Sequence, residues 1–431
     1  MTNTDNNAMS HSPERAKEDK TMEIMDFDQA IAHLLGFADR ALLRQDQPHE
    51  LTLPLADCLG KVLAHSVFAP SAVPPAPVSA LDGYAVNTDD LDTEGETCLP
   101  VSLRIAAGHV APPLPRGTAA RIFTGAALPP RANAVIAQEA SHFTDGRVCF
   151  THRPVAGEDV KAPGSDLEEG QLLLDRGRRL QPQDIALAAS AGIDRLSVYR
   201  PLKVAVLCSG DELVDPGQPL APGCIYNANR FLIPAQIEAL GMIAISVDRL
   251  ADTLSATQKA LLAATETADV IITTGGVSVG EEDHIRAAIQ SLGSLHIWRI
   301  KMRPGKPFTF GRIGPGDTPV LGLPGNPVSA FLNFALLAQP FLLKAQGVVA
   351  HQPLSFRLPA GFDWPKPRPH REFLRARIDP SDPLSRVMLY PNQGASALIS
   401  TTWANGIVVV REQQTIQVGD LVEFIPFSGL S

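Results

Sequence analysis

Apolar residues recur along the chain in two different rhythms, and each rhythm predicts a different kind of domain. Between residues 26 and 44 they return every three or four positions, as in an amphipathic helix. That apolar face could pack within its own domain or against a second subunit. From residue 202 onward, short β-branched runs alternate with stretches of helical spacing. The alternation predicts a three-layer α/β domain with a largely parallel sheet.

The α/β segment can be divided further by where each apolar run starts and stops. The predicted strands are 204–208, 243–247, 270–273, 297–302, 308–310 and 320–323. The predicted helices are 229–240, one after Asp252 that runs to about 265, one that starts at 284, and one that starts near 328. Residues 320–343 are the most apolar, but Pro324, Gly325 and Pro327 interrupt them. We interpret them as a buried strand and helix, not as a membrane span.

Outside this segment the apolar runs are shorter, with Gly, Pro and Asp turns between them, which is typical of small β domains. Pro182 opens a short helix and Gly192 follows it, as expected for a helix start and stop. The prediction is therefore a multidomain α/β plus β protein: one three-layer α/β domain, two smaller β-rich domains and a helical or extended N-terminal domain. The predicted divisions are a disordered tail at 1–23, a discontinuous N-terminal dimerisation domain at 24–72 and 161–200, an inserted β domain at 73–160, the α/β domain at 201–350, and a C-terminal β domain at 351–431.

Composition narrows the class of protein. The chain has 431 residues and a net charge of −9, with 45% hydrophobic and 19% charged residues, which describes a soluble globular protein and argues against a nucleic-acid partner. The first twenty-odd residues are polar and lack the apolar segment of a signal peptide. The five cysteines are scattered, odd in number and never spaced as C-x-x-C. We therefore expect a reducing cytoplasm and neither a zinc framework nor a disulfide scaffold.

Three glycine-bearing loops follow predicted strands, at residues 209–212, 275–278 and 322–327. Open α/β sheets bind ligands at the carboxyl ends of their strands, where free backbone N–H groups favour an anion. A glycine pair such as Gly275-Gly276 could also be a plain tight turn, but three such loops favour a nucleotide or phosphate site. Neither a G-x-G-x-x-G nor a G-x-x-x-x-G-K-[ST] motif occurs, so the chain is not predicted to be a dinucleotide-binding protein or a P-loop NTPase.

Acidic residues also follow these strands. Glu212, Asp252 and Asp283 beside a phosphate would suit Mg²⁺, which prefers oxygen ligands. For Asp252 the plainer explanation is a helix cap, and Asn326 followed by Pro327 is explained equally well as a cap and a first helical residue. No H-E-x-x-H motif or Cys/His cluster indicates a transition metal, and no paired Ser/His/Asp signal is present.

Positive charges are informative because the whole chain is acidic. Arg303 and Lys306 flank Pro304-Gly305, which fixes the backbone between them, so an oxyanion site is about as probable as a solvated loop. A second group of cations begins the last domain: Lys366, Arg368, Arg371, Arg375 and Arg377. In the first β domain, Asp82-Gly83 favours a plain turn over a functional carboxylate on local grounds.

Taken together, these stretches resemble the molybdopterin molybdenumtransferase family, which includes bacterial enzymes and the C-terminal domain of gephyrin. The resemblance runs from about residue 24 to the end, and its matching stretches are 79–85, 124–126, 209–213, 274–283, 304–307, 322–329 and 404–406. It implies an enzyme that takes adenylylated molybdopterin and molybdate, inserts the metal at the dithiolene, and releases AMP with the help of Mg²⁺. It also implies a cytoplasmic homodimer whose cleft lies between the α/β domain of one subunit and the small β domain of the other.

The resemblance assigns roles to residues of this chain. The catalytic and Mg²⁺-positioning residues would be Asp82, Thr124, Glu212, Asp252 and Asp283, with the last three holding the metal. The loops would bind the pterin-linked phosphates through Ser209, Gly210, Gly275, Gly276, Ser278, Pro324, Gly325, Asn326, Pro327 and Ser329. Molybdate would bind Arg303 and Lys306, with Arg375 and Ser396 contributing from the last domain.

Two other functions remain open at this point. Residues 203–345 also resemble the molybdopterin adenylyltransferases, which attach AMP instead of removing it. A non-enzymatic module that clusters partners, as gephyrin-like chains can, is the second. The flanking β domains, the Pro-Gly-Lys-Pro stretch and the intact acids favour the insertase. Transient contact with an adenylyltransferase and with apo-molybdoenzymes is expected, and contact with nucleic acid or a membrane is not.

Overall fold

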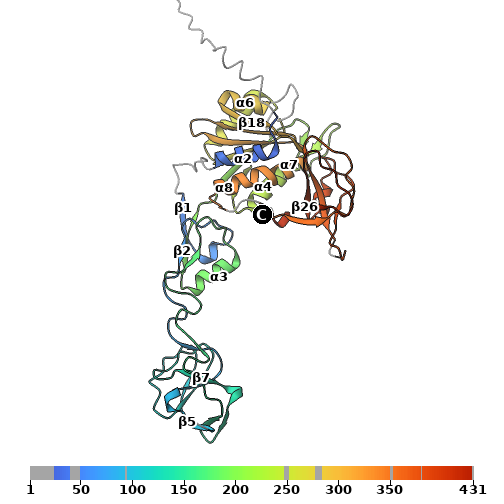
Figure 1. The fold of residues 1–431 in the computed structure, drawn as a ribbon. Helices are drawn as coiled ribbons and strands as arrows, with labels where there is room; N and C mark the ends of the chain where they lie inside the picture. Colours follow the sequence, from blue (N-terminus) through green and yellow to red (C-terminus); the bar gives the residue numbers. More distant parts are fainter. Residues whose placement is uncertain are drawn as a thin grey trace, which may run out of the picture. The chain divides into compact units, whose positions relative to one another are not determined.

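The computed structural model describes residues 24–38, 49–92, 95–246, 252–276, 284–349, 353–379 and 381–429. Its contacts divide the chain into two compact units (Figure 1). The first unit contains Met1–Leu51, Gly60–Val62 and Tyr199–Ser431, and the second contains Thr52–Leu59 and Leu63–Val198. Each unit is described here by itself.

A six-stranded sheet forms the centre of the first unit, in the order β16-β13-β17-β21-β20-β18. The strands are β16 (Ile243–Ser246), β13 (Lys203–Cys208), β17 (Val270–Thr274), β21 (Thr318–Leu323), β20 (Pro307–Ile313) and β18 (Gly293–Arg299). The first four run parallel, whereas β20 and β18 are antiparallel to their neighbours. This arrangement confirms the predicted α/β domain and adds an antiparallel edge.

The prediction of one strand over 297–302 was wrong. β18 begins earlier, at Gly293, and ends at Arg299, whereas Met302–Arg303 forms a separate strand, β19. β19 pairs with β23 in another sheet. The apolar run is continuous in the sequence, but the chain leaves one sheet and joins another within it, and periodicity cannot show which partner a strand finds.

Helices cover both faces of the central sheet (Figure 1). On one face lie α5 (Leu254–Thr265) and α6 (His284–Leu292), which bury Leu261, Ile285 and Ile289 against the strands. On the other face lie α2 (Phe27–Ala38), α4 (Asn229–Ala239), α7 (Pro327–Asn333) and α8 (Gln339–Ala345). The helices on these two faces form the outer layers of the predicted three-layer domain.

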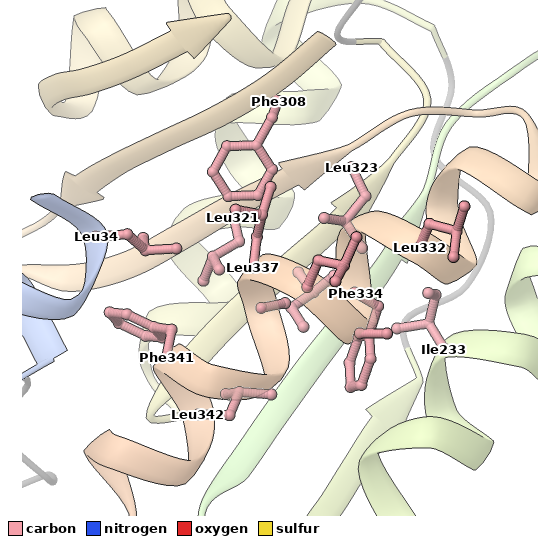
Figure 2. Close-up of a cluster of buried hydrophobic side chains, with 14 of the residues drawn as sticks. Leu34, Ile233, Phe308, Leu321, Leu323, Leu332, Phe334, Leu337, Phe341 and Leu342 are labelled. Atoms are coloured by element: carbon pink, nitrogen blue, oxygen red, sulfur yellow. The ribbon is translucent and has the colours of Figure 1, made fainter. Parts of the chain in front are cut away.

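The larger core lies under the second face. In Figure 2, Phe308, Leu321 and Leu323 of the sheet meet Phe334, Leu337 and Phe341 of the helical segment, with Leu34 and Ile233 joining from α2 and α4. Leu34 of α2 is fully buried there. The apolar face of this first helix therefore packs within its own unit, which decides between the two alternatives that its sequence left open.

Residues Pro327–Ala345 form one helical segment in which the π-helical turn η4 (Phe334–Ala338) connects α7 to α8. By length and composition it could cross a membrane, but 83% of its most apolar window is buried inside the unit. The segment is thus a core helix that follows a buried strand, as predicted.

A second six-stranded sheet completes the first unit, in the order β19-β23-β25-β26-β22, with β24 beside β23. Its strands are β19 (Met302–Arg303), β23 (Arg371–Ile378), β25 (Gly406–Val410), β26 (Leu421–Pro426), β22 (Phe356–Pro359) and β24 (Val387–Leu389). Phe373, Ile407 and Ile425 of this sheet extend the core of the α/β layers. The two sheets therefore share one hydrophobic core. The remaining elements of the unit are β14 (Leu213–Val214), β15 (Ile225–Tyr226), α9 (Ile399–Trp403) and η5 (Phe427–Gly429).

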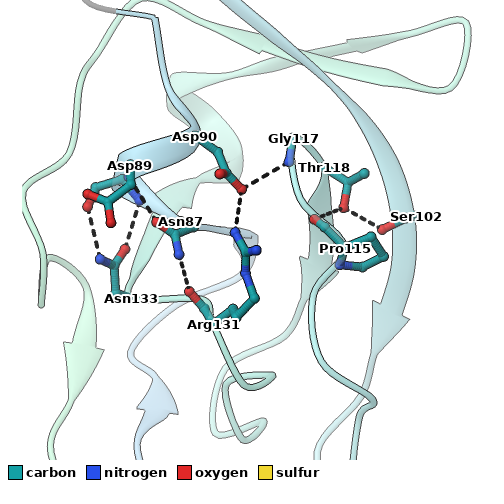
Figure 3. A network of polar contacts seen from close by, with 10 residues as sticks. Asn87, Asp89, Asp90, Ser102, Pro115, Gly117, Thr118, Arg131 and Asn133 are labelled. Atoms are coloured by element: carbon teal, nitrogen blue, oxygen red, sulfur yellow. Dashed lines mark hydrogen bonds and ion pairs between the residues drawn. The ribbon is translucent and has the colours of Figure 1, made fainter.

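The second unit contains another six-stranded sheet, in the order β7-β4-β6-β5-β9-β8. These strands are β7 (Ala134–Ala137), β4 (Gly83–Val86), β6 (Ala119–Ile122), β5 (Thr97–Ile105), β9 (Arg147–Phe150) and β8 (His142–Thr144). Its loops are joined by the polar network of Figure 3, in which Asp90 accepts 2.9 Å bonds from Arg131 and from the N–H of Gly117. This sheet confirms a small β-rich domain early in the chain.

Shorter elements make up the rest of the second unit. α3 (Pro182–Ser190) has the predicted start and stop: Pro182 is its first residue, and Gly192 just after it has φ +81°. The others are β1 (Glu50–Pro54), which begins in the first unit, η1 (Leu55–Asp57), β2 (Val67–Phe68), β3 (Val78–Ser79), η2 (Thr88–Asp90), η3 (Gln138–Ala140), β10 (Val160–Lys161), β11 (Leu172–Leu174) and β12 (Arg195–Tyr199).

No disulfide scaffold was predicted from the sequence, but the structure has one disulfide, between Cys98 and Cys149. The two lie directly opposite each other on the antiparallel strands β5 and β9. They are 51 residues apart in the chain, so only the strand pairing brings them together. A search for short cysteine spacings cannot detect such a pair.

Candidate functional site

A cleft of ≈ 880 Å³ opens at the carboxyl ends of β13, β17 and β21 in the first unit. The loops after these three strands form one wall of it. Arg303–Pro307 and residues of the C-terminal sheet and its loops form the rest. Because the three strands are parallel neighbours, loops that are more than 40 residues apart in the sequence meet at one edge, as the sequence predicted.

Backbone hydrogen bonds hold the three loops together. The N–H of Ser209 donates to the carbonyl of Thr274 at 3.1 Å, and the N–H of Gly275 donates to that of Leu323 at 3.2 Å. Gly275 has φ +84°, and a Cβ there would lie 2.5 Å from the Ser209 carbonyl oxygen. The glycine is therefore required both for the backbone conformation and for the close approach of the two loops.

Two carboxylates line this wall of the cleft. The carboxylate of Glu212 folds back over Gly210, where a Cβ would lie 2.6 Å from its Oε2. Asp252 is not the cap of the following helix, because Thr253 occupies that position and its hydroxyl accepts the N–H of Ala256 at 3.3 Å. The plainer explanation of Asp252 is thus wrong, and its side chain lines the cleft instead.

Two asparagines add oxygen atoms to the same wall. Asn326 is at the cap position of α7, with Pro327 at the first helical position, but its side chain makes no capping hydrogen bond. Asn229 donates to the carbonyl of Gly325 at 2.8 Å, and its buried Oδ1 has no hydrogen-bond partner among the described residues. Glu212, Asp252 and Asn229 thus all line this cleft with oxygen atoms, the type of ligand that Mg²⁺ prefers.

The opposite wall of the cleft carries positive charges beside the carboxylate of Glu372. Arg303 and Lys306 both line it, and neither forms an ion pair with a carboxylate in the part of the chain that the structure describes. A Cβ on Gly305, between them, would lie 1.9 Å from the Nδ2 of Asn333, so this loop is held tightly against the core helix. The charges of this loop therefore face the cleft from a fixed backbone.

Arg375 is the most unusual of the cations, because it is fully buried. Its Nε donates to the Ser400 hydroxyl at 3.0 Å and its Nη2 to the carbonyl of Gly394 at 2.9 Å. Its Nη1 has no partner among the described residues. Burial lowers the pKa of Arg375 to about 10, so the side chain still carries its charge at pH 7. Burial of a positive charge without a carboxylate partner lowers stability by roughly several kcal/mol. Such a buried cation therefore indicates a binding place for an anion.

Comparisons with known proteins place these features in a family. Family models match along most of the chain: the MoeA N-terminal region (domain I and II) at 25–192, a probable molybdopterin binding domain at 205–344, and the MoeA C-terminal region (domain IV) at 357–427. A molybdopterin molybdenumtransferase of Haemophilus influenzae is 39% identical over 297 residues, which are 68% of this chain and 72% of that one. The chain belongs to the molybdopterin molybdenumtransferase family.

Other members are similar over a larger share of the chain. Molybdopterin molybdenumtransferase 2 of Mycobacterium tuberculosis is 33% identical over 84% of this chain and 91% of its own. A solved structure of the molybdopterin biosynthesis MoeA protein from Pyrococcus horikoshii covers 94% of this chain and 99% of its own, with a TM-score of 0.77 and 30% identity. The resemblance and the fold class expected from the sequence are thus confirmed.

Most of the site residues predicted from the sequence lie around this cleft. Those that line it are Ser209, Gly210, Glu212, Asp252, Gly275, Gly276, Arg303, Lys306, Pro324, Gly325, Asn326, Pro327, Ser329 and Arg375. Ser396 is exposed and is not among the lining residues, although its neighbour Ala395 is. Ser278 and Asp283 fall outside the described residues.

Asp82 and Thr124 belong to the second unit, where they contact each other. The N–H and the hydroxyl of Thr124 both donate to Asp82 Oδ1, each at 2.8 Å. These two hydrogen bonds, the backbone one first, lower the pKa of Asp82, so it is ionised at neutral pH. The pair is thus a fixed carboxylate and hydroxyl on the small β domain of this family member.

The structure also adds lining residues that the sequence did not reveal: Asn229, Trp364, Glu372 and Gln393. Trp364 donates its indole N–H to Glu372 at 2.8 Å, and Gln393 accepts the N–H of Arg375 at 2.9 Å. No spacing links these residues, because they come together through β23 and the loops beside it. The local signal that the sequence offers for these residues is a tryptophan, Trp364, in a proline-rich stretch.

Proposed function

We propose that this chain is a molybdenum insertase, which takes adenylylated molybdopterin and molybdate, inserts the metal at the dithiolene and releases AMP. The observation that carries the proposal is Arg375, a buried cation whose Nη1 has no partner among the described residues, on the same cleft as Glu212, Asp252 and three glycine loops. The cleft therefore offers a place for a phosphorylated substrate and one for a small oxyanion.

The glycine loops would hold the phosphates of the substrate. Gly276 and Gly325 line the cleft without side chains, so phosphate oxygens could approach the backbone of these loops closely. The side chains of Asn326 and Ser329 line the same wall and could donate further hydrogen bonds. Binding at several fixed points would orient the substrate without a covalent intermediate, and no activated nucleophile was found in the sequence.

Molybdate would bind the opposite wall. It is a tetrahedral dianion, and Arg303, Lys306 and Arg375 bring three positive charges, none of which forms an ion pair with a described carboxylate, although Glu372 also lines the cleft. The planar fork of Arg375 is held in one orientation by Ser400 and Gly394, so its unused N–H is preorganised for an oxyanion. These cations would both bind molybdate and stabilise the charge that develops during transfer.

Magnesium is the cofactor we infer, with Glu212 and Asp252 as its ligands and Asp283, which the sequence adds, as a third. The orphaned Oδ1 of Asn229 supports the fit of this donor set to a hard cation. When bound, Mg²⁺ would offset the negative charge of the phosphates as AMP leaves. The acids of the chain would hold the ion, the glycine loops would orient the phosphates, and Arg375 would keep molybdate at the other wall.

Release of AMP from purified protein tests the proposal. With adenylylated molybdopterin and Mg²⁺ present, we expect AMP to appear only after molybdate is added. Asp252→Asn and Asp283→Ala should each lower the rate by about 10²-fold, since each removes a ligand of the ion that would offset the charge of the phosphates. Asp317→Asn, which changes an exposed acid paired with Arg312, is the matched control and should not change the rate. Equal rates in all four proteins would contradict the assignment.

The same assay separates the insertase from the adenylyltransferase. Incubation with molybdopterin and ATP, without molybdate, should give no adenylylated molybdopterin. If that product accumulates, the direction of the reaction is opposite to the one proposed. If neither reaction occurs in a folded protein, a binding module is the better explanation.

We further propose a homodimer in which Asp82 and Thr124 serve the cleft of the other subunit, with the predicted domain at 24–72 and 161–200 holding the subunits together. Mixing two inactive variants, Asp82→Ala and Asp252→Asn, tests it. A shared site would restore about a quarter of the activity in the mixture after subunit exchange, by random pairing of two chains. No restoration in a mixed dimer would place both residues in one subunit's site. A cytoplasmic location and transient contacts with the enzymes before and after this step belong to the same proposal.

A further inference from the structure

Three neighbouring strands of the second unit carry a row of residues with metal-binding side chains. Cys98 on β5 lies opposite Cys149 on β9, and Cys149 in turn lies opposite His142 on β8. Residues that face each other across antiparallel strands point to the same side of the sheet, with Cβ atoms about 4.5–5.5 Å apart. Two sulfurs and an imidazole therefore project from one face of this edge of the sheet.

Glu96 adds a carboxylate to the row. It precedes Cys98 by two positions, and its Oε2 lies 4.0 Å from the Cys98 sulfur. Its Oε1 lies 3.7 Å from Nε2 of His142. The ligand atoms of Glu96, Cys98 and Cys149 all lie within 4.8 Å of one another. The glutamate thus bridges the two ends of the row.

We propose that reduction of the Cys98–Cys149 disulfide converts this row into a zinc site with Cys98, Cys149, His142 and Glu96 as ligands. A dithiol reductant would supply two electrons and two protons, become a disulfide itself and leave two thiols. Zinc would then displace the two thiol protons and bind the thiolates. Two sulfurs, one nitrogen and one oxygen are a donor set that tetrahedral Zn²⁺ accepts, and four protein ligands make a structural site, not a catalytic one.

The plainer explanation is a disulfide that only staples two strands. That explanation accounts for the cysteines but not for Glu96 and His142, which approach each other beside the sulfurs. Both cysteines are half-buried, and Glu96 and His142 are exposed, so a reductant and a metal ion can reach the row. The other described cysteines form no disulfide: Cys58 and Cys208 are buried, and Cys224 is half-buried. The site would make the small β domain respond to the thiol redox state of its surroundings.

Metal content of the full-length protein tests the proposal. After reduction with a phosphine and removal of excess reductant, we expect the protein to bind one equivalent of zinc per chain more than the oxidised protein binds. Co²⁺ in place of zinc should give the thiolate charge-transfer band and the intense d–d bands of a tetrahedral site. Cys149→Ser should abolish these bands, and Cys224→Ser should leave them unchanged.

The ligands that a staple does not need decide between the two explanations. Glu96→Gln and His142→Ala keep both cysteines, and each should weaken zinc binding to the reduced protein by at least the roughly 10–100-fold that loss of an outer-shell partner costs. His109→Ala, at an exposed histidine of the same unit, should have no effect. If Glu96→Gln and His142→Ala bind zinc as tightly as the parent, or if reduced protein binds no more than the oxidised protein, the row is only a staple. Metal binding is measured without turnover, so failure here is distinct from failure of the proposed insertase.

Discussion

The two ends of the parallel strands β13 and β17 differ in whether a buried charge near them is paired with an opposite charge. Just before β13 and β17, Arg200 and Asp269 form a buried bidentate ion pair, with N–O distances of 2.8 and 2.7 Å. Asp269 also accepts the N–H of Lys203 at 2.8 Å, and Gln346 bonds both the N–H of Leu202 and the carbonyl of Arg200 at 2.7 Å. At this end the buried positive charge is therefore paired with a negative charge of the same chain. We call it the matched end.

At the carboxyl ends of β13 and β17, which we call the unmatched end, a buried positive charge has no such ion pair. Arg375 is as deeply buried as Arg200, but it contacts a hydroxyl and two carbonyls and no carboxylate, and its Nη1 has no partner among the described residues. Asn229, across the cleft, has an orphaned oxygen. Since an unmatched buried polar group lowers stability, its retention favours a ligand that completes it. The difference between the two ends is one of charge: Arg200 has a carboxylate partner, although its Nε also lacks a hydrogen bond among the described residues, whereas Arg375 has no carboxylate partner there.

The largest expected effect comes from breaking the matched end. Asp269→Asn leaves Arg200 buried without its counter-charge, so the free energy of unfolding should fall by about 3–5 kcal/mol. The chain's three tryptophans, Trp298, Trp364 and Trp403, all lie in the first unit, so their fluorescence during urea unfolding reports on this unit alone.

The control for this change is Asp317→Asn, which removes a pair between Arg312 and an acid that is 61% exposed. Its cost should stay below about 1 kcal/mol, as for surface pairs in general. The rate of AMP release per folded molecule should be unchanged in both variants. If Asp269→Asn were no more costly than the control, the account of the matched end would be wrong.

At the unmatched end the expected pattern is reversed. Arg375→Met removes the buried cation that faces the cleft, so AMP release should fall about 10²–10³-fold, as when a preorganised oxyanion donor is lost. The unfolding free energy should change by less than in Asp269→Asn, because the lost hydrogen bonds are offset by removal of a desolvated charge. The control is Arg377→Met, which should retain the activity. Arg377 lies on the same strand as Arg375, but it is exposed and its guanidinium packs over the Trp403 ring. Equal stability losses at Asp269 and Arg375 would remove the distinction between the two ends.

A smaller effect is expected in the loop that carries Arg303 and Lys306. Gly305 has φ +100°, and a Cβ there would collide with Asn333, whose Nδ2 donates to the carbonyl of Ser329 at 2.9 Å. Gly305→Ala should therefore cost about 1–3 kcal/mol of stability and also weaken molybdate binding, which calorimetry can measure. Gly217→Ala is the matched control, because Gly217 has φ +93° but no atom within 4 Å of its Cβ position. Similar results for both would attribute the effect to φ alone and not to the tight packing of this loop.

What the sequence could predict were features with a local cause. The strands 204–208, 270–273 and 320–323 match β13, β17 and β21 to within two residues at each end, because a β-branched run ended by a glycine loop is a local signal. The glycine loops were placed together because parallel neighbours end at one edge.

What it could not predict depends on pairing between distant segments. Met302 pairs with Arg371 and Cys98 with Cys149, and neither register leaves a trace in local spacing. Trp364 and Glu372 reach the cleft in the same way, through a sheet whose order the sequence does not reveal. The cap alternative for Asp252 failed for another reason: a threonine one position later fits the cap equally well, and only the backbone decides between them.

The smallest expected effect distinguishes two helix starts. Thr253 caps α5 with a real hydrogen bond, so Thr253→Ala should cost about 1 kcal/mol of unfolding free energy. Asn326 occupies the equivalent position of α7 without such a bond, so Asn326→Ala should cost less than about 0.5 kcal/mol but lower the affinity for the adenylylated substrate. Urea unfolding and substrate titration measure the two quantities separately. If Asn326→Ala lost as much stability as Thr253→Ala and no affinity, Asn326 would be a structural residue and not part of the substrate-binding site.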